Sequence, residues 1–205
     1  MSRALAFFAA AAILLGVGLG AFLTLSRSGD RFAQCRESAI AGGTAEIGGP
    51  FSLITETGER MDAASAITKP TLVYFGYSFC PDFCPTDLSR NAIVADFLAG
   101  EGLDVGQLFI SIDPERDTPA AITDFTNALH PELVGLTGSP EEIAAAANAY
   151  RVYYRRADDD PEYYLMDHST FTYLMDPEHG FLEFFTSDAA PEEMAERVAC
   201  FVNAR

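Results

Sequence analysis

The chain carries two cysteines, Cys80 and Cys84, with three residues between them. They follow an apolar run at residues 71–75 and precede a helical pattern of apolar residues, so they lie where a buried strand gives way to a helix. The unpaired backbone N–H groups at a helix N-terminus lower the pKa of a nearby thiol. We therefore expect both cysteines to be partly ionised near neutral pH, and able to bind a metal ion or to exchange disulfides.

Pro85 indicates where the helix begins. A proline inside a helix loses a hydrogen bond and disfavours helical dihedrals at the preceding residue, whereas the first helical position tolerates it. The helix should therefore start near Cys84, with Pro85 at its first position and Cys80 in the loop before it. Thioredoxin-type oxidoreductases have only two residues between their cysteines, and the wider loop here favours a metal ion shared by both sulfurs.

The elements that must position this loop alternate between strand and helix. Capping residues, prolines and hydrophobic spacing predict the helices, and β-branched or aromatic runs predict the strands. The predicted strands are 51–54, 60–62, 71–75, 107–112, 133–136, 152–155, 170–174 and 181–185, and the predicted helices are 85–98, one starting at 119, 140–149 and 191–202. This order favours an α/β domain with a mixed sheet and helices on both faces.

The N-terminal segment differs in composition from the rest of the chain. Residues 4–26 are apolar or small and uncharged, which is long enough to span a bilayer. We expect residues 1–26 to be an uncleaved membrane anchor, with a cleaved signal peptide as the alternative. Residues 27–46, which include Cys35, form a linker, and residues 47–205 form one globular domain.

The charge balance excludes one class of partner. The 205 residues carry a formal net charge of −17. A nucleic-acid-binding surface needs a basic excess that this chain lacks, so no nucleic acid is expected as a partner. The negative charge is better explained as keeping a soluble domain dispersed.

Three motifs together carry a resemblance to a known family. They are the stretches at residues 80–85, 111–118 and 167–170, in this order along the chain. Over residues 47–205 the sequence resembles the Sco/SenC family of membrane-anchored copper proteins. The resemblance implies a thioredoxin-like fold with inserted elements, preceded by one N-terminal transmembrane helix. It also implies a single-pass inner-membrane protein with its soluble domain in the periplasm.

The resemblance also implies a metal site and a role. Carried over by position, the copper ligands are Cys80, Cys84 and His168. Thiolates suit Cu(I) and imidazole suits both oxidation states, so this set could hold Cu(I) and Cu(II). The implied role is assembly of the binuclear copper site (CuA) of cytochrome c oxidase. The implied partner is the oxidase subunit that bears this site, with other copper chaperones or thiol reductants as further candidates.

His168 is far from the cysteines in sequence, but the fold should bring it close. We expect it in the loop before the terminal hairpin, beside the helix that follows Cys84. Thioredoxin-like oxidoreductases have a cis-proline at this point, whereas residues 169–173 contain no proline, which leaves space beside the sulfurs. His130 and His179 have no such placement and are interpreted as ordinary side chains.

Several acidic residues lie near the predicted ligands. Asp82 and Asp167 could orient a ligand by contact with it, or attract copper. The segment containing Asp113, Glu115, Arg116 and Asp117 could likewise support the site or dock a partner. Its alternative interpretation is local: a helix cap by Thr118 and an ion pair for Arg116.

The other two cysteines suggest a structural bond. In the oxidising compartment that the resemblance implies, unpaired thiols are a liability and disulfides persist. We expect a disulfide between Cys35 and Cys200, which would pin the linker to the terminal helix. The alternative is that Cys200 is a buried core thiol.

Two functions remain open. The first is a copper metallochaperone, which binds and delivers copper and is not an enzyme. The second is a thiol–disulfide oxidoreductase that reduces the cysteines of the same target or senses redox state. Both use Cys80 and Cys84, as ligands or as a redox-active pair, but only the first requires His168. A peroxidase is disfavoured because the chain shows no clear peroxidatic motif.

Overall fold

The computed structural model describes residues 31–36, 47–158, 160 and 163–205. The chain divides into two compact units, Met1–Gln34 and Cys35–Arg205. The expected membrane anchor at residues 1–26 and most of the linker lie outside the described residues. Within the described part of the chain, no helix is both long and apolar enough to cross a bilayer.

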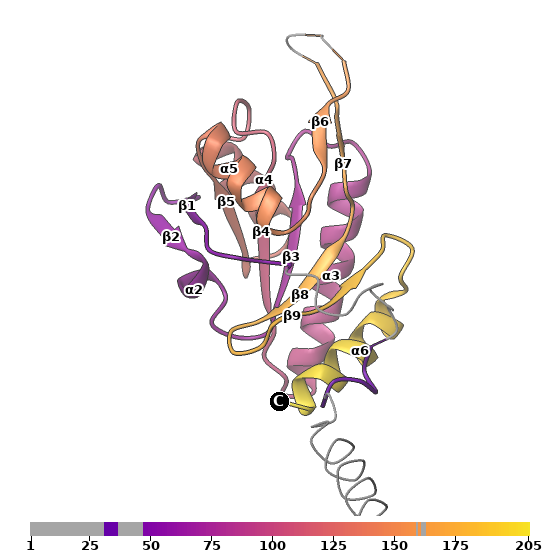
Figure 1. The fold of residues 1–205 in the computed structure, drawn as a ribbon. Coiled ribbons are helices and arrows are strands. Elements are labelled where there is room, and N and C mark those ends of the chain that lie inside the picture. The colour runs from indigo at the N-terminus through magenta and orange to yellow at the C-terminus, as the bar shows by residue number, and fades with distance from the viewer. Residues whose placement is uncertain (1–30, 37–46, 159, 161–162) are drawn as a thin grey trace, which may run out of the picture. The chain divides into compact units, whose positions relative to one another are not determined.

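The second unit contains the helices and strands that surround the cysteine motif (Figure 1). In chain order they are β1 (Ser52–Thr55), β2 (Arg60–Asp62), α2 (Ala63–Ala66), β3 (Thr71–Gly76), α3 (Phe83–Gly100), β4 (Gly106–Ser111), α4 (Pro119–Leu129), β5 (Leu133–Thr137), α5 (Pro140–Ala149), β6 (Tyr154–Arg156), β7 (Met166–His168), β8 (Thr172–Asp176), β9 (Gly180–Phe185) and α6 (Pro191–Asn203).

One seven-stranded sheet forms the centre of this unit, in the order β2-β1-β5-β4-β3-β8-β9. Strands β3, β4 and β5 are parallel, whereas β8 pairs antiparallel with β3 and β1 pairs antiparallel with β5. All six residues of β3 are buried, as expected for a strand covered on both faces. The cysteine motif therefore follows the central strand of the sheet.

Consecutive residues of β3 show which helices cover which face. The Tyr74 hydroxyl donates a hydrogen bond to Asp87 on α3, while the Phe75 ring packs 5.1 Å from the Tyr150 ring just after α5. Because successive side chains of a strand point to opposite faces, α3 and the end of α5 lie on opposite sides of the sheet. Helix α6 packs beside α3 (Figure 1). The expected mixed sheet with helices on both faces is confirmed.

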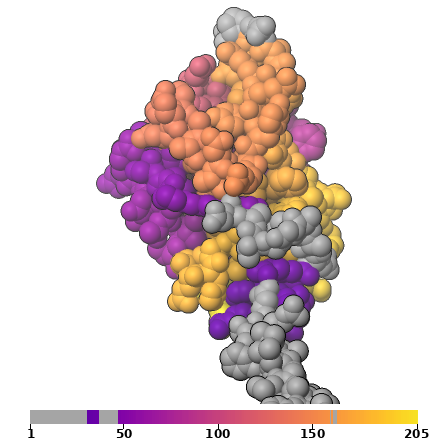
Figure 2. All heavy atoms as spheres, viewed as in Figure 1, coloured from indigo at the N-terminus to yellow at the C-terminus, as the bar shows by residue number. Residues whose placement is uncertain are grey.

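The structure contains two short elements that the sequence did not predict, α2 and β7. Residues 166–168 form a strand, β7, that the sequence analysis left in a loop. Strand β7 pairs antiparallel with β6 in a separate two-stranded ribbon, which extends beyond the end of the main sheet (Figure 1). The atoms of α5 and of this ribbon lie next to one another on the viewed surface (Figure 2). The prediction missed β7 because Met166–His168 contains no β-branched residue and no Phe, Tyr or Trp, and its pairing with β6 determines its structure.

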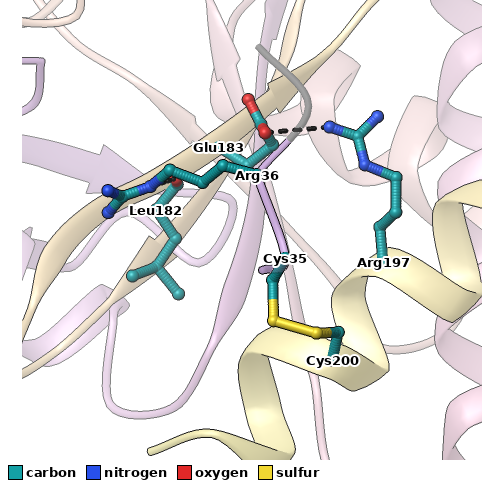
Figure 3. The surroundings of a disulfide bond; sticks show 6 residues. All are labelled: Cys35, Arg36, Leu182, Glu183, Arg197 and Cys200. Carbon is teal, nitrogen blue, oxygen red and sulfur yellow. Dashed lines mark hydrogen bonds and ion pairs between the residues drawn. A yellow bond between two sulfur atoms is a disulfide. The ribbon is translucent and has the colours of Figure 1, made fainter. Parts of the chain in front are cut away.

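A disulfide joins the first residue of this unit to its last helix (Figure 3). The Cys35 and Cys200 sulfurs are bonded, and the Cα atoms of the two residues lie 5.6 Å apart. Beside the bond, the Arg36 side chain donates to the Leu182 carbonyl at 3.3 Å. These contacts attach residues 35 and 36 to α6 and β9, so Cys200 is not a free thiol.

Candidate metal centre

Three soft or borderline donors meet at one end of the sheet. The sulfurs of Cys80 and Cys84 and one ring nitrogen of His168 all lie within 4.8 Å of one another. They come from three places in the chain: the loop after β3, the first turn of α3 and the last residue of β7. The fold therefore brings together the three residues that the sequence analysis singled out, although His168 lies 84 positions after Cys84.

The loop between the cysteines curls so that the sulfurs approach each other. The backbone N–H of Cys80 donates to the Tyr77 carbonyl at 3.2 Å, and that of Cys84 donates to the Cys80 sulfur at 3.4 Å. The sequence predicted Pro85 at the first position of this helix, but α3 begins at Phe83, so Pro85 is its third residue. A proline is tolerated there because the first-turn N–H groups have no partner within the helix.

Gly76 makes the space for the inner sulfur. A Cβ atom built at this position would lie 2.7 Å from the Cys84 sulfur and 2.9 Å from a ring carbon of Tyr74. No side chain larger than hydrogen fits against these atoms without displacing them. The glycine that ends β3 is therefore part of the site, although the sequence analysis did not single it out.

The two thiols differ in their protonation. Hydrogen bonding from the Cys84 thiol lowers the pKa of Cys80 well below its ordinary value, and the N–H groups of Cys84 and Asp82 act in the same direction. Burial raises the pKa of Cys84, and the neighbouring Cys80 raises it further. The expectation that both cysteines are partly ionised is therefore wrong for Cys84, because removal from water outweighs the effect of the helix N-terminus.

The orientation of His168 follows from its neighbours. Its Nδ1 lies 2.9 Å from the Ser169 carbonyl oxygen, which can only accept a hydrogen bond, so Nδ1 carries the proton. In the neutral ring Nε2 then carries the lone pair, and it faces the Cys84 sulfur at 3.5 Å. The Tyr74 and Tyr77 rings stand nearly perpendicular to the imidazole, at centroid distances of 6.2 and 5.9 Å. A lone pair is therefore fixed toward the sulfurs, as a metal ligand requires.

The Asp167 carboxylate is paired with an arginine, and Asp82 acts through its backbone. The Asp167 carboxylate accepts hydrogen bonds from Arg155 at 2.8 and 3.1 Å, and both side chains are exposed. The ring of His168 is instead oriented by a backbone carbonyl. Asp82 is the N-cap residue of α3, but its side chain makes no capping hydrogen bond. Its backbone N–H, not its carboxylate, acts on Cys80.

The connection from β4 to α4 supports the cysteine loop. The fully buried Asp117 accepts hydrogen bonds from the backbone N–H of Ser78 at 3.1 Å and from the Ser111 hydroxyl at 2.6 Å. The local interpretation of this segment also holds, since Thr118 caps α4 and Arg116 pairs with Asp113. The sequence analysis considered Asp117 only as a general supporting residue, because its contact with Ser78 crosses 39 residues.

A groove of about 720 Å³ opens onto the donor cluster. Cys80 and His168 line it, together with Phe83, Tyr153 and Leu165, whereas Cys84 lies behind them. An incoming ion would therefore meet Cys80 and His168 first. Of the other histidines, His130 hydrogen-bonds Gln107 and pairs with Asp96, and His179 lies in the β8–β9 turn, so neither joins the cluster.

Comparison with known proteins identifies relatives of the whole domain. Residues 40–203 match the family model described as SCO1/SenC. The chain is 50% identical over 204 residues to protein SenC of Rhodobacter capsulatus, covering 99% of this chain and 92% of that protein.

Solved structures of similar sequence share the fold. A crystal structure of Arabidopsis thaliana ScoI with copper bound matches with a TM-score of 0.71 and 42% identity, covering 77% of this chain and 97% of the other. Bradyrhizobium japonicum ScoI with copper bound matches with a TM-score of 0.68 and 40% identity, covering 75% and 98%. The thioredoxin-like α/β fold expected from the sequence is confirmed by these matches.

Proposed function

Because this chain belongs to the SCO1/SenC family, we propose that it is a copper metallochaperone that binds copper through Cys80, Cys84 and His168. The observation that carries this proposal is the meeting of two sulfurs and one imidazole nitrogen within 4.8 Å. The copper-bound structures of two relatives support copper as the ion. Delivery to the CuA site of cytochrome c oxidase is part of the proposal.

The donor chemistry supports copper over harder ions. Two thiolates are soft ligands that stabilise Cu(I), and a neutral imidazole is accepted by both Cu(I) and Cu(II). Cys80 supplies a thiolate readily, whereas the buried Cys84 must release its proton when the ion binds. We infer that the site holds both oxidation states, with the histidine contributing most to Cu(II).

The position of the donors supports transfer as well as binding. Cys80 and His168 face the groove, so donors of a second protein could approach the ion from that side. An ion held by these three residues would be open to a further donor from the groove side. The proposed acceptor is the oxidase subunit that bears the CuA site, and other copper chaperones or thiol reductants are proposed as suppliers of copper or electrons.

We also propose where the protein works. A single-pass anchor at residues 1–26 would hold the domain at the inner membrane, with the domain in the periplasm. The disulfide between Cys35 and Cys200 supports this location, because such bonds persist in oxidising compartments and are rare in the cytosol.

A thiol–disulfide oxidoreductase remains the second candidate. The lowered pKa of Cys80 favours it, since a thiolate is the attacking species in disulfide exchange. Such a reductase would act on the cysteines of the same oxidase site. It would not need an imidazole nitrogen facing the inner sulfur, which makes His168 the discriminating residue.

The two functions predict different outcomes in cells grown with limiting copper. Cells whose only copy carries His168→Ala should assemble oxidase that is poor in CuA and has lost most of its activity, and added copper should partly restore it. Cys80→Ser should cause the same loss. Oxidase activity and copper content of isolated membranes measure this. Full activity with His168→Ala, alongside a loss with Cys80→Ser, would instead establish thiol reduction as the function.

A further inference from the structure

One arginine contacts both of the segments that lead to the donor residues. Arg116 lies in the connection between β4 and α4, and it reaches the segment before Cys80 and the segment before His168. We propose that Arg116 is a positioning residue that holds the β6–β7 ribbon, and with it His168, against the cysteine loop. The effect on copper rests on the proposed function, whereas the effect on the ribbon does not.

Arg116 contacts the segment that leads to His168 through Tyr164. Arg116 Nη1 donates to the Tyr164 carbonyl at 2.9 Å, and its guanidinium carbon lies 3.5 Å from the centroid of the Tyr164 ring. Tyr164 is only 3% exposed, although its neighbours Tyr163 and Leu165 are 77% and 47% exposed. Tyr164 thus anchors this segment to the domain, together with Tyr154 and Met166, which pack against the core.

A second arginine completes a stack on the same ring. The guanidinium carbon of Arg156 on β6 also lies 3.5 Å from the Tyr164 centroid. Two guanidinium groups cannot both lie directly over one face at that distance, so one occupies each face. The Tyr164 hydroxyl donates to Asp113 at 2.6 Å, and Asp113 in turn accepts from Arg116 Nε at 2.6 Å. The ring is therefore held on both faces and at its hydroxyl.

Arg116 contacts the segment that leads to Cys80 through two aromatic rings. The Arg116 guanidinium carbon lies 4.7 Å from the Phe79 ring and 5.8 Å from the Tyr77 ring. Phe79 immediately precedes Cys80, and it is 55% exposed apart from this contact. The buried Nη2 of Arg116 has no hydrogen-bond partner, which is consistent with a group packed over aromatic faces.

The ribbon depends on such side-chain contacts because it has no place in the main sheet. Strands β6 and β7 pair only with each other. At the base of the ribbon, the Ser169 N–H donates to the Tyr153 carbonyl. This bond joins the residue after β7 to the residue before β6, so it also lies within the ribbon. Loss of the Arg116 contacts should therefore let β7 move while the domain stays folded.

Such movement should affect the two copper states differently. Two thiolates satisfy Cu(I), whereas Cu(II) gains more from the imidazole. A histidine that is less well placed should weaken Cu(II) binding more than Cu(I) binding. Arg116 would then act on the copper midpoint potential without touching the ion.

The test uses the full-length chain with Arg116→Lys, which keeps the charge beside Asp113 but removes the planar fork and the stack. We expect the ratio of Cu(II) to Cu(I) affinity to fall at least about tenfold, which raises the copper midpoint potential by about 59 mV. Arg60→Lys is the matched control, because Arg60 forms an exposed ion pair with Glu142 on another part of the domain.

A second measurement on the copper-free protein separates this inference from the copper proposal. Amide hydrogen exchange of β7 should be faster in Arg116→Lys than in the wild-type chain, with the central strands unchanged. Tyr164→Leu, which removes the ring and leaves the Asp113–Arg116 pair intact, should have the same effect. Wild-type exchange of β7 in both variants would overturn the positioning role. A wild-type chain that binds no copper would refute only the proposed function.

Discussion

Replacement of His168 by alanine is expected to remove the Cu(II) form of the protein. The imidazole is the only nitrogen donor in the cluster, and changes to groups that merely support a ligand already cost about 10–100-fold in metal affinity. Loss of the ligand itself should therefore weaken Cu(II) binding by more than about 100-fold. A titration with Cu(II), followed by the sulfur-to-copper charge-transfer absorption, measures this loss.

The same variant should keep its thiol chemistry. Imidazole is not needed for a thiolate to attack a disulfide, so Cys80 and Cys84 should still cycle between dithiol and disulfide. Quantification of free thiols before and after oxidation checks this. His179→Ala is the matched control, because His179 is exposed in the β8–β9 turn and outside the cluster. If His168→Ala kept the absorption band at wild-type strength, His168 would not be a ligand.

Gly76→Ala should lower the stability of the fold and weaken the metal site. The added methyl group would meet the Cys84 sulfur at 2.7 Å and ring carbons of Tyr74 and Phe109 at 2.9 and 3.3 Å. These side chains are almost fully buried, so relief requires movement of the core. Overpacking of this kind costs about 1–3 kcal/mol of unfolding free energy. We also expect copper binding and disulfide formation to weaken together, because Cys84 serves both.

Denaturant unfolding and copper titration of the same samples test this prediction. Gly100→Ala is the matched control, since nothing lies within 4 Å of a Cβ atom at the end of α3. That change should leave the stability equal or slightly raised, because alanine is favoured over glycine in a helix. If Gly76→Ala matched Gly100→Ala in stability and in copper binding, the packing account of Cys84 would be incorrect.

The elements around the cysteines could be predicted from local patterns. The apolar run of β3, Pro85 near the start of α3, and the proline and capping signals of α4 and α5 are short-range features, and the structure has these elements where they were expected. His168 is different. No periodicity or spacing connects it to Cys84, and it was selected by resemblance to a family. Only the tertiary structure places its Nε2 near the sulfur.

The rest of the site could not be inferred because it depends on contacts between distant segments. The pKa of Cys84 is set by burial, which a sequence pattern near a helix N-terminus does not reveal. The roles of Asp117 and Arg116 depend on contacts with Ser78 and Tyr164 across the fold. Strand β7 is defined by its pairing with β6 more than by its own composition.

X-ray absorption at the copper edge of the loaded, full-length protein is the most direct test of the central claim. The account predicts a first shell in which sulfur and nitrogen both contribute to Cu(II), from the donors Cys80, Cys84 and His168. The nitrogen contribution should disappear in His168→Ala. A first shell of nitrogen and oxygen alone in the wild-type protein would contradict the account.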